Sequence, residues 1–370
     1  MASMLEFRTP GFNPYAVKYS PYYDSRIAVA SAANYGIVGN GRLFCLGLGP
    51  QGIQTARYRR NTANLAFEAS TPTMPSMTLA WSEINENQLL AACGDGSVKL
   101  YDVNVNEFPV MNFHEHKREA YSVAWSPVTK DTFASSSWDG TIKILIQAAS
   151  KWSPTRTESI RTLPVGNCTY STSYCPSNPN IISAVSTDSH LRIFDLRTPV
   201  NAQYHLTAKI PVHQPPSVPM PPGVSPPFMP AEILTHDWNK YRDTVIATGG
   251  VDRVIRTFDI RNPNSGPASI MMGHDYAVRR LAWSPHAADI LLSASYDMTV
   301  RLWTDGSTMA ADESSSPVKP GLQLGIMNRH TEFVTGVDWC LFGTGSWVAT
   351  VGWDERVLLW DANTMLQGRS

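Results

Sequence analysis

The sequence lacks the features that would place the chain in a membrane, in an oxidising compartment or on nucleic acid. Its 370 residues contain no apolar run of the ~18 residues that a membrane span needs, and no signal peptide opens them. The net charge is −1, so no excess of basic side chains would attract nucleic acid. Five cysteines form no CxxC pair, and an odd number favours a reducing compartment. We therefore expect a cytosolic protein with no integral membrane segment and no nucleic-acid partner.

Signatures of enzymes are also missing. No Gly-rich phosphate loop follows an expected strand and opens a helix. His114 and His116 stand two residues apart, but no third ligand follows at a spacing typical of a metal site. The sequence therefore predicts no cofactor, no metal and no catalytic residue.

A block of about 25 residues that recurs seven times dominates the chain. Each copy has an aromatic anchor, a hydrophobic run ending in small residues, a turn with an acidic or amide residue, and an alternating strand. The anchors are Tyr19, Trp81, Trp125, Tyr174, Trp238, Trp283 and Trp339. The turn residues are Asn34, Asp95, Asp139, Asp188, Asp252, Asp297 and Asp354. Anchor and turn keep a nearly constant separation, so length varies between the units and not within them.

The shortest anchor intervals, 44 and 45 residues, match one four-stranded WD-repeat blade. Seven such units predict an all-β fold, a seven-bladed WD-repeat β-propeller that forms one domain over residues 1–370. The alternating segment at residues 5–9 is expected to close the ring by completing the blade of residues 334–361. Two insertions lengthen the intervals between repeats. We expect a proline-rich loop at residues 200–231, with nine prolines in 211–230, and a surface loop at 305–321.

Histidine, serine or threonine, aspartate and tryptophan recur at fixed spacing in three blades. A buried hydrogen-bonded chain of this kind would stabilise a blade. Because the set repeats, we interpret it as structural and not as a Ser–His–Asp catalytic triad. Blades six and seven carry complete sets, and blade three has Leu145 in place of the tryptophan. The structural residues are His116, Asp139, His274, Ser293, Asp297, Trp303, His330, Thr350, Asp354 and Trp360.

Function on a propeller lies on its exposed rims. Three positions per blade are expected to line the narrow face around the channel: six and four residues before the anchor, and the residue before the turn. They place seven aromatic side chains, two glutamates and one arginine around one mouth, as in a protein-binding hot spot. The candidate peptide-binding residues are Glu119, Tyr121, Trp138, Tyr170, Glu232, Leu234, Arg279, Tyr296, Phe333 and Trp353. Packing of Trp138 and Trp353 between blades is the alternative.

Several stretches of the chain resemble one family. These are NYGIVGNGRLFCL (34–46), EAYSVAWSP (119–127), HDWNKYRDTVIATGGVDRVIRTFDIRN (236–262), GHDYAVRR (273–280) and RHTEFVTGVDWC (329–340). They are similar to the peroxisomal type-2 targeting-signal receptors, the seventh-peroxin family of WD-repeat proteins, in a fungal version. The proline insertion and the absence of Trp and Asp after Ile144 depart from the family pattern.

The resemblance implies a cytoplasmic import receptor that shuttles to the peroxisome, reaching its membrane and matrix. Its ligand would be an N-terminal nonapeptide helix on matrix enzymes such as thiolase, with a basic residue, an aliphatic residue, five variable positions, His or Gln, and Leu or Ala. A fungal co-receptor peroxin would cover that helix, and the pair would deliver cargo to the peroxisomal docking complex. No enzymatic activity is implied.

One alternative belongs to another class of function. Asp195-Leu196-Arg197 and Asp259-Ile260-Arg261 match the Asp-x-Arg pattern of WD-repeat substrate receptors of cullin ubiquitin ligases. An arginine also follows simply from ending a strand at the surface. A pull-down distinguishes the two functions by recovering either peroxisomal enzymes and a peroxin or a ligase adaptor.

Overall fold

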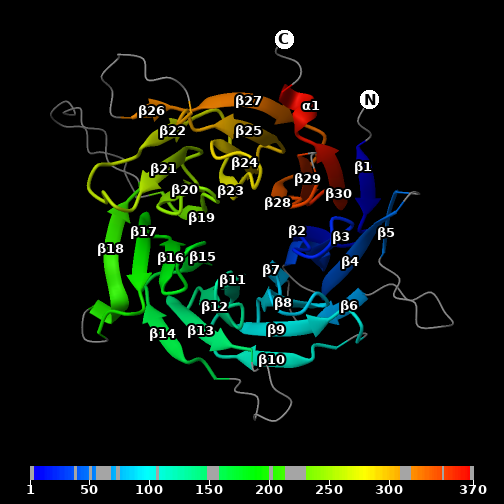
Figure 1. Cartoon of the computed structure of the whole chain (residues 1–370). Helices are drawn as coiled ribbons and strands as arrows, with labels where there is room; N and C mark the ends of the chain where they lie inside the picture. Colours follow the sequence, from blue (N-terminus) through cyan, green and yellow to red (C-terminus); the bar gives the residue numbers. More distant parts are fainter. Residues whose placement is uncertain are drawn as a thin grey trace, which may run out of the picture.

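Seven β-sheets, antiparallel except for one short parallel addition, are arranged as blades around a central channel in the computed structural model (Figure 1). The structure describes residues 4–36, 40–49, 52–55, 68–71, 76–105, 108–147, 158–199, 203–212, 231–308, 318–343 and 346–366. In each blade the first strand of the repeat lies next to the channel and the last lies at the outer edge (Figure 1). The predicted seven-bladed β-propeller is therefore confirmed.

The first four blades follow one another along the chain. Blade one contains β2 (Asn13–Tyr19), β3 (Arg26–Ala32) and β4 (Gly41–Gly49), with β5 (Gly52–Thr55) and β6 (Glu68–Thr71) both paired to β4. Blade two contains β7 (Ser76–Trp81), β8 (Gln88–Cys93), β9 (Ser97–Asp102) and β10 (Met111–His114). Blade three contains β11 (Ala120–Trp125), β12 (Thr132–Ser137), β13 (Thr141–Ile146) and β14 (Arg161–Pro164). Blade four contains β15 (Thr169–Tyr174), β16 (Ile181–Ser186), β17 (His190–Asp195) and β18 (Leu206–Pro211).

The remaining three blades complete the ring. Blade five contains β19 (Ile233–Trp238), β20 (Val245–Gly250), β21 (Ile255–Asp259), β22 (Ser269–Met271) and β26 (Lys319–Pro320). Blade six contains β23 (Val278–Trp283), β24 (Ile290–Ser295), β25 (Val300–Thr304) and β27 (Leu322–Met327). Blade seven contains β28 (Val334–Trp339), β29 (Trp347–Gly352), β30 (Arg356–Asp361) and β1 (Leu5–Arg8). Short helical turns are η1 (Ala33–Gly36), η2 (Gln203–His205) and α1 (Asn363–Leu366).

The N-terminal strand closes the ring, as the sequence predicts. β1 pairs antiparallel with β30, with Leu5 opposite Leu359 and Arg8 opposite Arg356. Arg356 adds two hydrogen bonds from its guanidinium to the carboxylate of Glu6, at 2.8 and 3.0 Å. This pairing covers the edge of β30, which would otherwise present unpaired backbone groups.

The hydrophobic core lies between neighbouring blades, because each blade buries both of its faces. One cluster joins Val17 and Ile27 of blade one to Val351 and Leu359 of blade seven. Equivalent clusters fill each of the other six blade interfaces. No blade could bury this surface alone, which is why the repeats are stable only as a ring.

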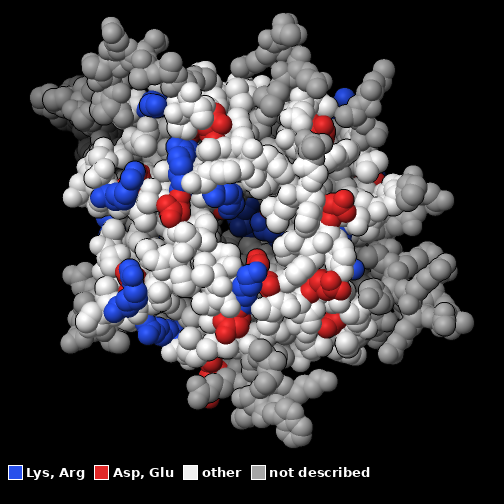
Figure 2. All heavy atoms as spheres, in the orientation of Figure 1, with Lys and Arg blue, Asp and Glu red and all other residues white. Residues whose placement is uncertain are grey.

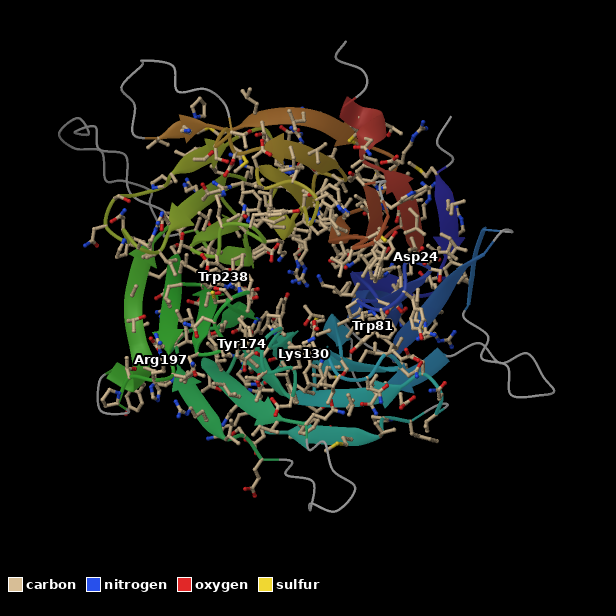
Figure 3. All side chains as sticks on the ribbon, viewed as in Figure 1. Asp24, Trp81, Lys130, Tyr174, Arg197 and Trp238 are labelled. Carbon is tan, nitrogen blue, oxygen red and sulfur yellow. The ribbon has the colours of Figure 1, made fainter. Side chains whose placement is uncertain are left out.

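Three of the aromatic anchors, Trp81, Trp125 and Trp339, tie their blade to the innermost strand of the preceding one. The indole nitrogen of Trp81 donates to the carbonyl of Lys18 at 3.0 Å, and that of Trp339 donates to the carbonyl of Ala282 at 3.0 Å. Both bonds join the innermost strands of adjacent blades. Figure 3 shows Trp81, Tyr174 and Trp238 around the centre of the molecule, each from a different blade. The anchor positions therefore recur because the blade contact recurs.

Two predicted loop boundaries are wrong. The segment 200–231 contains η2 and β18, which pairs with β17 as the outer strand of blade four. Proline at position 211 is compatible with that strand because β18 is an edge strand, where a missing amide donor is tolerated. The segment 305–321 contains β26, a short parallel addition to β22. Residues 213–230 and 309–317, which make up most of the two insertions, lie outside the described residues.

Candidate functional site

A β-bulge at the same place in every innermost strand builds the rim of the channel. The register between the first and second strands shifts by one residue in all seven blades. The residues skipped by the pairing are Tyr15, Met77, Tyr121, Tyr170, Leu234, Arg279 and Thr335. A bulge re-aims a side chain away from the sheet. These are the positions four residues before the anchors, so the repeat itself generates the rim.

The other two rim positions of a blade are linked through their backbones. The amide of Trp138 donates to the carbonyl of Glu119 at 3.1 Å, and the amide of Trp353 donates to the carbonyl of Phe333 at 2.9 Å. The same bond joins Val251 to Glu232 in blade five. The turn of each of these blades is thus fixed beside the start of its inner strand, and their side chains share one face.

Three aromatic rings form the first rim cluster, across blades three and four. Tyr121 stacks on Trp138 with ring centroids 5.4 Å apart and an interplanar angle of 12°. Tyr170 meets Tyr121 edge-on at 5.0 Å and Trp138 at 6.0 Å. All three side chains are half-buried. We call Tyr121, Trp138 and Tyr170 the blade-three cluster, an apolar surface with rings fixed by one another.

A second cluster spans blades six, seven and one. Trp353 lies at its centre, with Phe333 at 5.4 Å, Tyr15 at 5.6 Å and Tyr35 at 5.4 Å between ring centroids. Tyr296 packs on Phe333 at 4.8 Å. We call these five residues the blade-seven cluster. The tyrosine hydroxyl of Tyr15 donates to the carbonyl of Tyr35 at 2.6 Å, which fixes the turn that carries Tyr35.

Two of the candidate residues lie below the surface. Arg279 is 3% exposed and Leu234 is 8% exposed, so neither presents a free side chain on the rim. Arg279 leaves β23 of blade six and reaches the ring of Tyr121 in blade three, at 5.2 Å from the centroid. It therefore crosses the channel mouth and supports the blade-three cluster from beneath by a cation–π contact.

The two rim glutamates differ in their surroundings. Glu232 accepts a hydrogen bond from the hydroxyl of Tyr170 at 2.8 Å, which leaves its second carboxylate oxygen without a protein donor among the described residues. Glu119 lies 3.6 Å from the guanidinium of Arg118, and both side chains are exposed by more than a third. Burial and the carboxylate of Glu232 together raise the pKa of Tyr170, so its hydroxyl stays protonated and keeps Glu232 in place.

The structure thus brings eight of the ten candidate residues to two aromatic surfaces with a glutamate pair beside one of them. The rings of Trp138 and Trp353 are half-buried, and their indole nitrogens have no hydrogen-bond partner in the described part of the chain. The position four residues before the anchor predicts Tyr15 as one of the seven aromatic side chains at the mouth, although Tyr15 is not one of the ten candidate residues. Sequence reasoning missed Tyr35 as a member of the blade-seven cluster. Tyr35 comes from the η1 turn, where its φ of 54° could not be anticipated.

Buried histidines hold three blades together. His116 contacts Asp139 at 3.0 Å and Ser135 at 2.8 Å. His274 contacts Asp297 at 2.7 Å and Ser293 at 2.6 Å, and Trp303 donates to the same serine at 2.8 Å. Burial opposes the charge of Asp297, but the hydrogen bond and charge interaction with His274, together with hydrogen bonds from Thr299 and the amide of Asp275, outweigh burial and hold the pKa of that carboxyl well below its usual range. These aspartates remain ionised and paired at neutral pH.

In blade seven the expected chain is incomplete. His330 contacts Asp354 at 3.0 Å and Thr350 at 3.0 Å, but the indole nitrogen of Trp360 has no hydrogen-bond partner among the described residues. The prediction of a complete set is wrong here.

A variant of this chain crosses from blade four to blade five. Ser183 on β16 contacts Nε2 of His236 at 2.7 Å and accepts from the indole nitrogen of Trp238 at 2.8 Å, both on β19. Burial lowers the pKa of His236 to about 4, so the imidazole is neutral at neutral pH. Spacing within one repeat could not reveal this bond, because its partners belong to different repeats.

The repeated histidine sets offer no route for a substrate. His116, His274 and His330 are 3%, 6% and 5% exposed, so their imidazoles are sealed inside the blades. Among the residues that the structure describes, no group of three or more potential metal ligands is found. No helix in the described part is long and apolar enough to cross a membrane.

The Asp-x-Arg pairs form local ion pairs. Arg197 contacts Asp195 at 2.7 Å and Arg261 contacts Asp259 at 2.5 Å, and both arginines are exposed. Arg197 lies at the outer edge of the propeller (Figure 3). Each pair closes the end of a third strand at the surface.

Comparisons with known proteins agree with this architecture. The family model described as "WD domain, G-beta repeat" matches residues 107–144, 266–304 and 321–361. The chain is 35% identical to the peroxisomal targeting signal 2 receptor of Saccharomyces cerevisiae over 97% of this chain and 99% of the relative. It is 36% identical to the receptor of the same name from Komagataella phaffii, over 98% and 100%. It is 34% identical to that of Mus musculus, over 98% of both.

Proposed function

The chain belongs to the family of peroxisomal targeting signal 2 receptors, a family of non-enzymatic WD-repeat propellers, and from this membership we propose that it binds type-2 targeting signals on its aromatic rim. The ligand is the N-terminal signal helix of peroxisomal matrix enzymes such as thiolase. The observation that carries the proposal is the blade-three cluster beside Glu232 and Glu119. It combines aromatic rings that hold one another in place with the carboxylates of two glutamates at the mouth of the channel.

The proposed ligand matches this chemistry. A nonapeptide with fixed positions one, two, eight and nine presents them on one helical face, because seven residues make about two turns. Its aliphatic side chains would lie on the rings of Tyr121, Trp138 and Trp353. Its basic side chain would bind the free oxygen of Glu232 or the carboxylate of Glu119.

The wider role follows from the same membership. A fungal co-receptor peroxin covers the bound helix, and the complex carries cargo from the cytoplasm to the peroxisomal docking complex, with the receptor reaching the membrane and matrix. The ubiquitin-ligase function is not adopted, because both arginines of the Asp-x-Arg pairs are engaged by their own aspartates and none of the relatives named above carries that description.

A binding cycle that neutralises the charge on the receptor, on the peptide or on both tests the proposal. Glu119→Gln and Glu232→Gln should each weaken binding of a fluorescent signal peptide, and the more important of the two by about tenfold, since a partly desolvated charged hydrogen bond contributes roughly 1.5–3 kcal/mol. The second peptide carries glutamine in place of its basic residue, and the variants should bind it as the wild type does. Glu158→Gln, an exposed change in the loop before β14, is the matched control and should change neither affinity.

The pairing is wrong if the glutamate variants lose as much affinity for the neutral peptide as for the basic one. The rim as a whole is excluded if no variant of its aromatic or acidic residues alters binding of either peptide.

A further inference from the structure

The central channel contains a cavity of about 460 Å³ that no part of the proposed rim occupies. Residues from all seven innermost strands line it, and in five of the blades the lining includes the anchor at the end of the strand. Figure 2 looks down the channel and shows Lys and Arg atoms inside the central hollow. A space of this size holds many water molecules and any small polar ligand.

Two neighbouring arginines of β23 bring unbalanced charge to this channel. Nη2 of Arg279 is buried with no hydrogen-bond partner among the described residues. Arg280 lines the cavity, and no ion pair joins it to a described carboxylate. Burial and the adjacent Arg279 lower the pKa of Arg280 to about 9, which still leaves it protonated at neutral pH. An unpaired charge inside a protein is strongly destabilising unless a counter-charge accompanies it.

Two of the three acidic side chains that line the cavity are engaged by lysines. Asp338 binds Lys18 at 2.6 Å and the amide of Tyr19 at 2.8 Å. Asp237 binds Lys240 at 2.8 Å and the amide of Trp283 at 2.8 Å. The third is Glu83, whose pKa burial raises, against the opposing effect of Lys130. None of the three forms an ion pair with Arg280 within the described part of the chain.

Polar groups suited to an anion also line the cavity, among many apolar side chains. Ser122, Ser171 and Thr172 contribute hydroxyl groups, and Nδ1 of His236 is buried without a hydrogen-bond partner among the described residues. Guanidinium groups bind oxyanions through two parallel hydrogen bonds, and low-dielectric walls strengthen that attraction. The charge in this channel is therefore complementary to a ligand that the protein itself does not supply.

We infer that the central channel is a binding site for a small oxyanion, a phosphate or a carboxylate, held by Arg280 beneath Arg279. The site is separate from the rim, because Arg279 crosses the channel between them. It does not depend on what the rim binds.

Equilibrium dialysis of the purified full chain with radiolabelled inorganic phosphate, at constant ionic strength in chloride, tests the inference. Wild type should bind phosphate saturably, one ion per chain. Arg280→Gln should weaken binding by about tenfold or more, because it removes the bidentate donor. Arg280→Lys keeps the positive charge but loses the two parallel donors of the guanidinium. Its phosphate affinity should therefore lie between those of wild type and Arg280→Gln. Arg329→Gln removes an exposed arginine outside the channel and should bind as wild type.

A competition arm with acetate distinguishes the two sources of the oxyanion. Displacement of phosphate by acetate means that the site also accepts carboxylates, and retention of phosphate means that it prefers phosphate; both support the site. Absence of saturable binding to wild type overturns the inference without reference to any variant. Equal loss of binding in Arg280→Gln and Arg329→Gln also overturns it, because binding would then follow net charge.

Discussion

The guanidinium of Arg279 in blade six lies 5.2 Å from the ring centroid of Tyr121 in blade three, across the mouth of the channel. Arg279 thus joins two sides of the ring that no backbone hydrogen bond connects within the described part of the chain. Above it Tyr121 stacks on Trp138, and below it the cavity begins at Arg280. The contact separates a rim suited to an amphipathic helix from a channel suited to an anion.

The paired aspartates support the fold and do not contact the rim. Asp297→Asn and Asp354→Asn should each lower the free energy of unfolding by about 1–3 kcal/mol, because each removes the charged partner of a buried histidine. Denaturant unfolding measures that loss. Signal-peptide affinity should stay at the wild-type value under conditions where the variants are folded. Native stability together with lost peptide binding would contradict the structural role.

Blades six and seven provide an internal comparison for the indole bond. Trp303→Phe loses a hydrogen bond to Ser293, whereas Trp360→Phe loses none within the described residues. Trp303→Phe should therefore be more destabilising than Trp360→Phe by about 1 kcal/mol in the same unfolding assay. Equal losses would mean that ring packing alone explains both tryptophans.

His236 should make stability depend on pH. Its pKa is about 4 in the folded chain against 6.5 when unperturbed, so the unfolded chain binds more protons between those values. Stability is fully present above about pH 6.5 and is lost as pH falls toward 4, by about 3 kcal/mol from this group. Burial similarly lowers the pKa of His274, which acts in the same direction.

Urea unfolding at several pH values between 7 and 4.5 measures this effect. His236→Asn should reduce the pH dependence of the unfolding free energy. A wild-type stability that is flat over this range would contradict the assignment.

Removal of residues 1–8 should open the ring. Leu5 and Phe7 pack on the core between blades seven and one, and their loss exposes the edge of β30. The expected fall in unfolding free energy is about 2–4 kcal/mol, on the scale of two partly buried apolar side chains. Glu6→Gln, which breaks only the surface pair with Arg356, should lower it by less than about 1 kcal/mol. If the truncated chain unfolds like the wild type, β1 does not contribute to closure.

The sequence predicts what repeats and misses what does not. The anchors and the turn aspartates follow from spacing because they recur along the chain, and the closing strand follows from its alternating pattern. The bond from His236 to Ser183 joins different repeats, and the position of Arg279 over Tyr121 depends on the diameter of the closed ring. Pairing registers were needed to see that the rim residues are bulged. Blade seven has the spacing of blade six, yet among the described residues Trp360 lacks the bond that Trp303 makes.

Fluorescence anisotropy of a labelled type-2 signal peptide, titrated with the purified protein, measures directly whether the aromatic rim is the signal-binding surface. Binding should be saturable and should weaken by about tenfold or more in Trp138→Ala and in Trp353→Ala, since buried aromatic contacts dominate such interfaces. The same peptide with its residues scrambled should not bind, and the losses of the tryptophan variants should change little with salt. Wild-type affinity in both tryptophan variants, or equal binding of the scrambled peptide, would show that the aromatic rim is not the receptor surface.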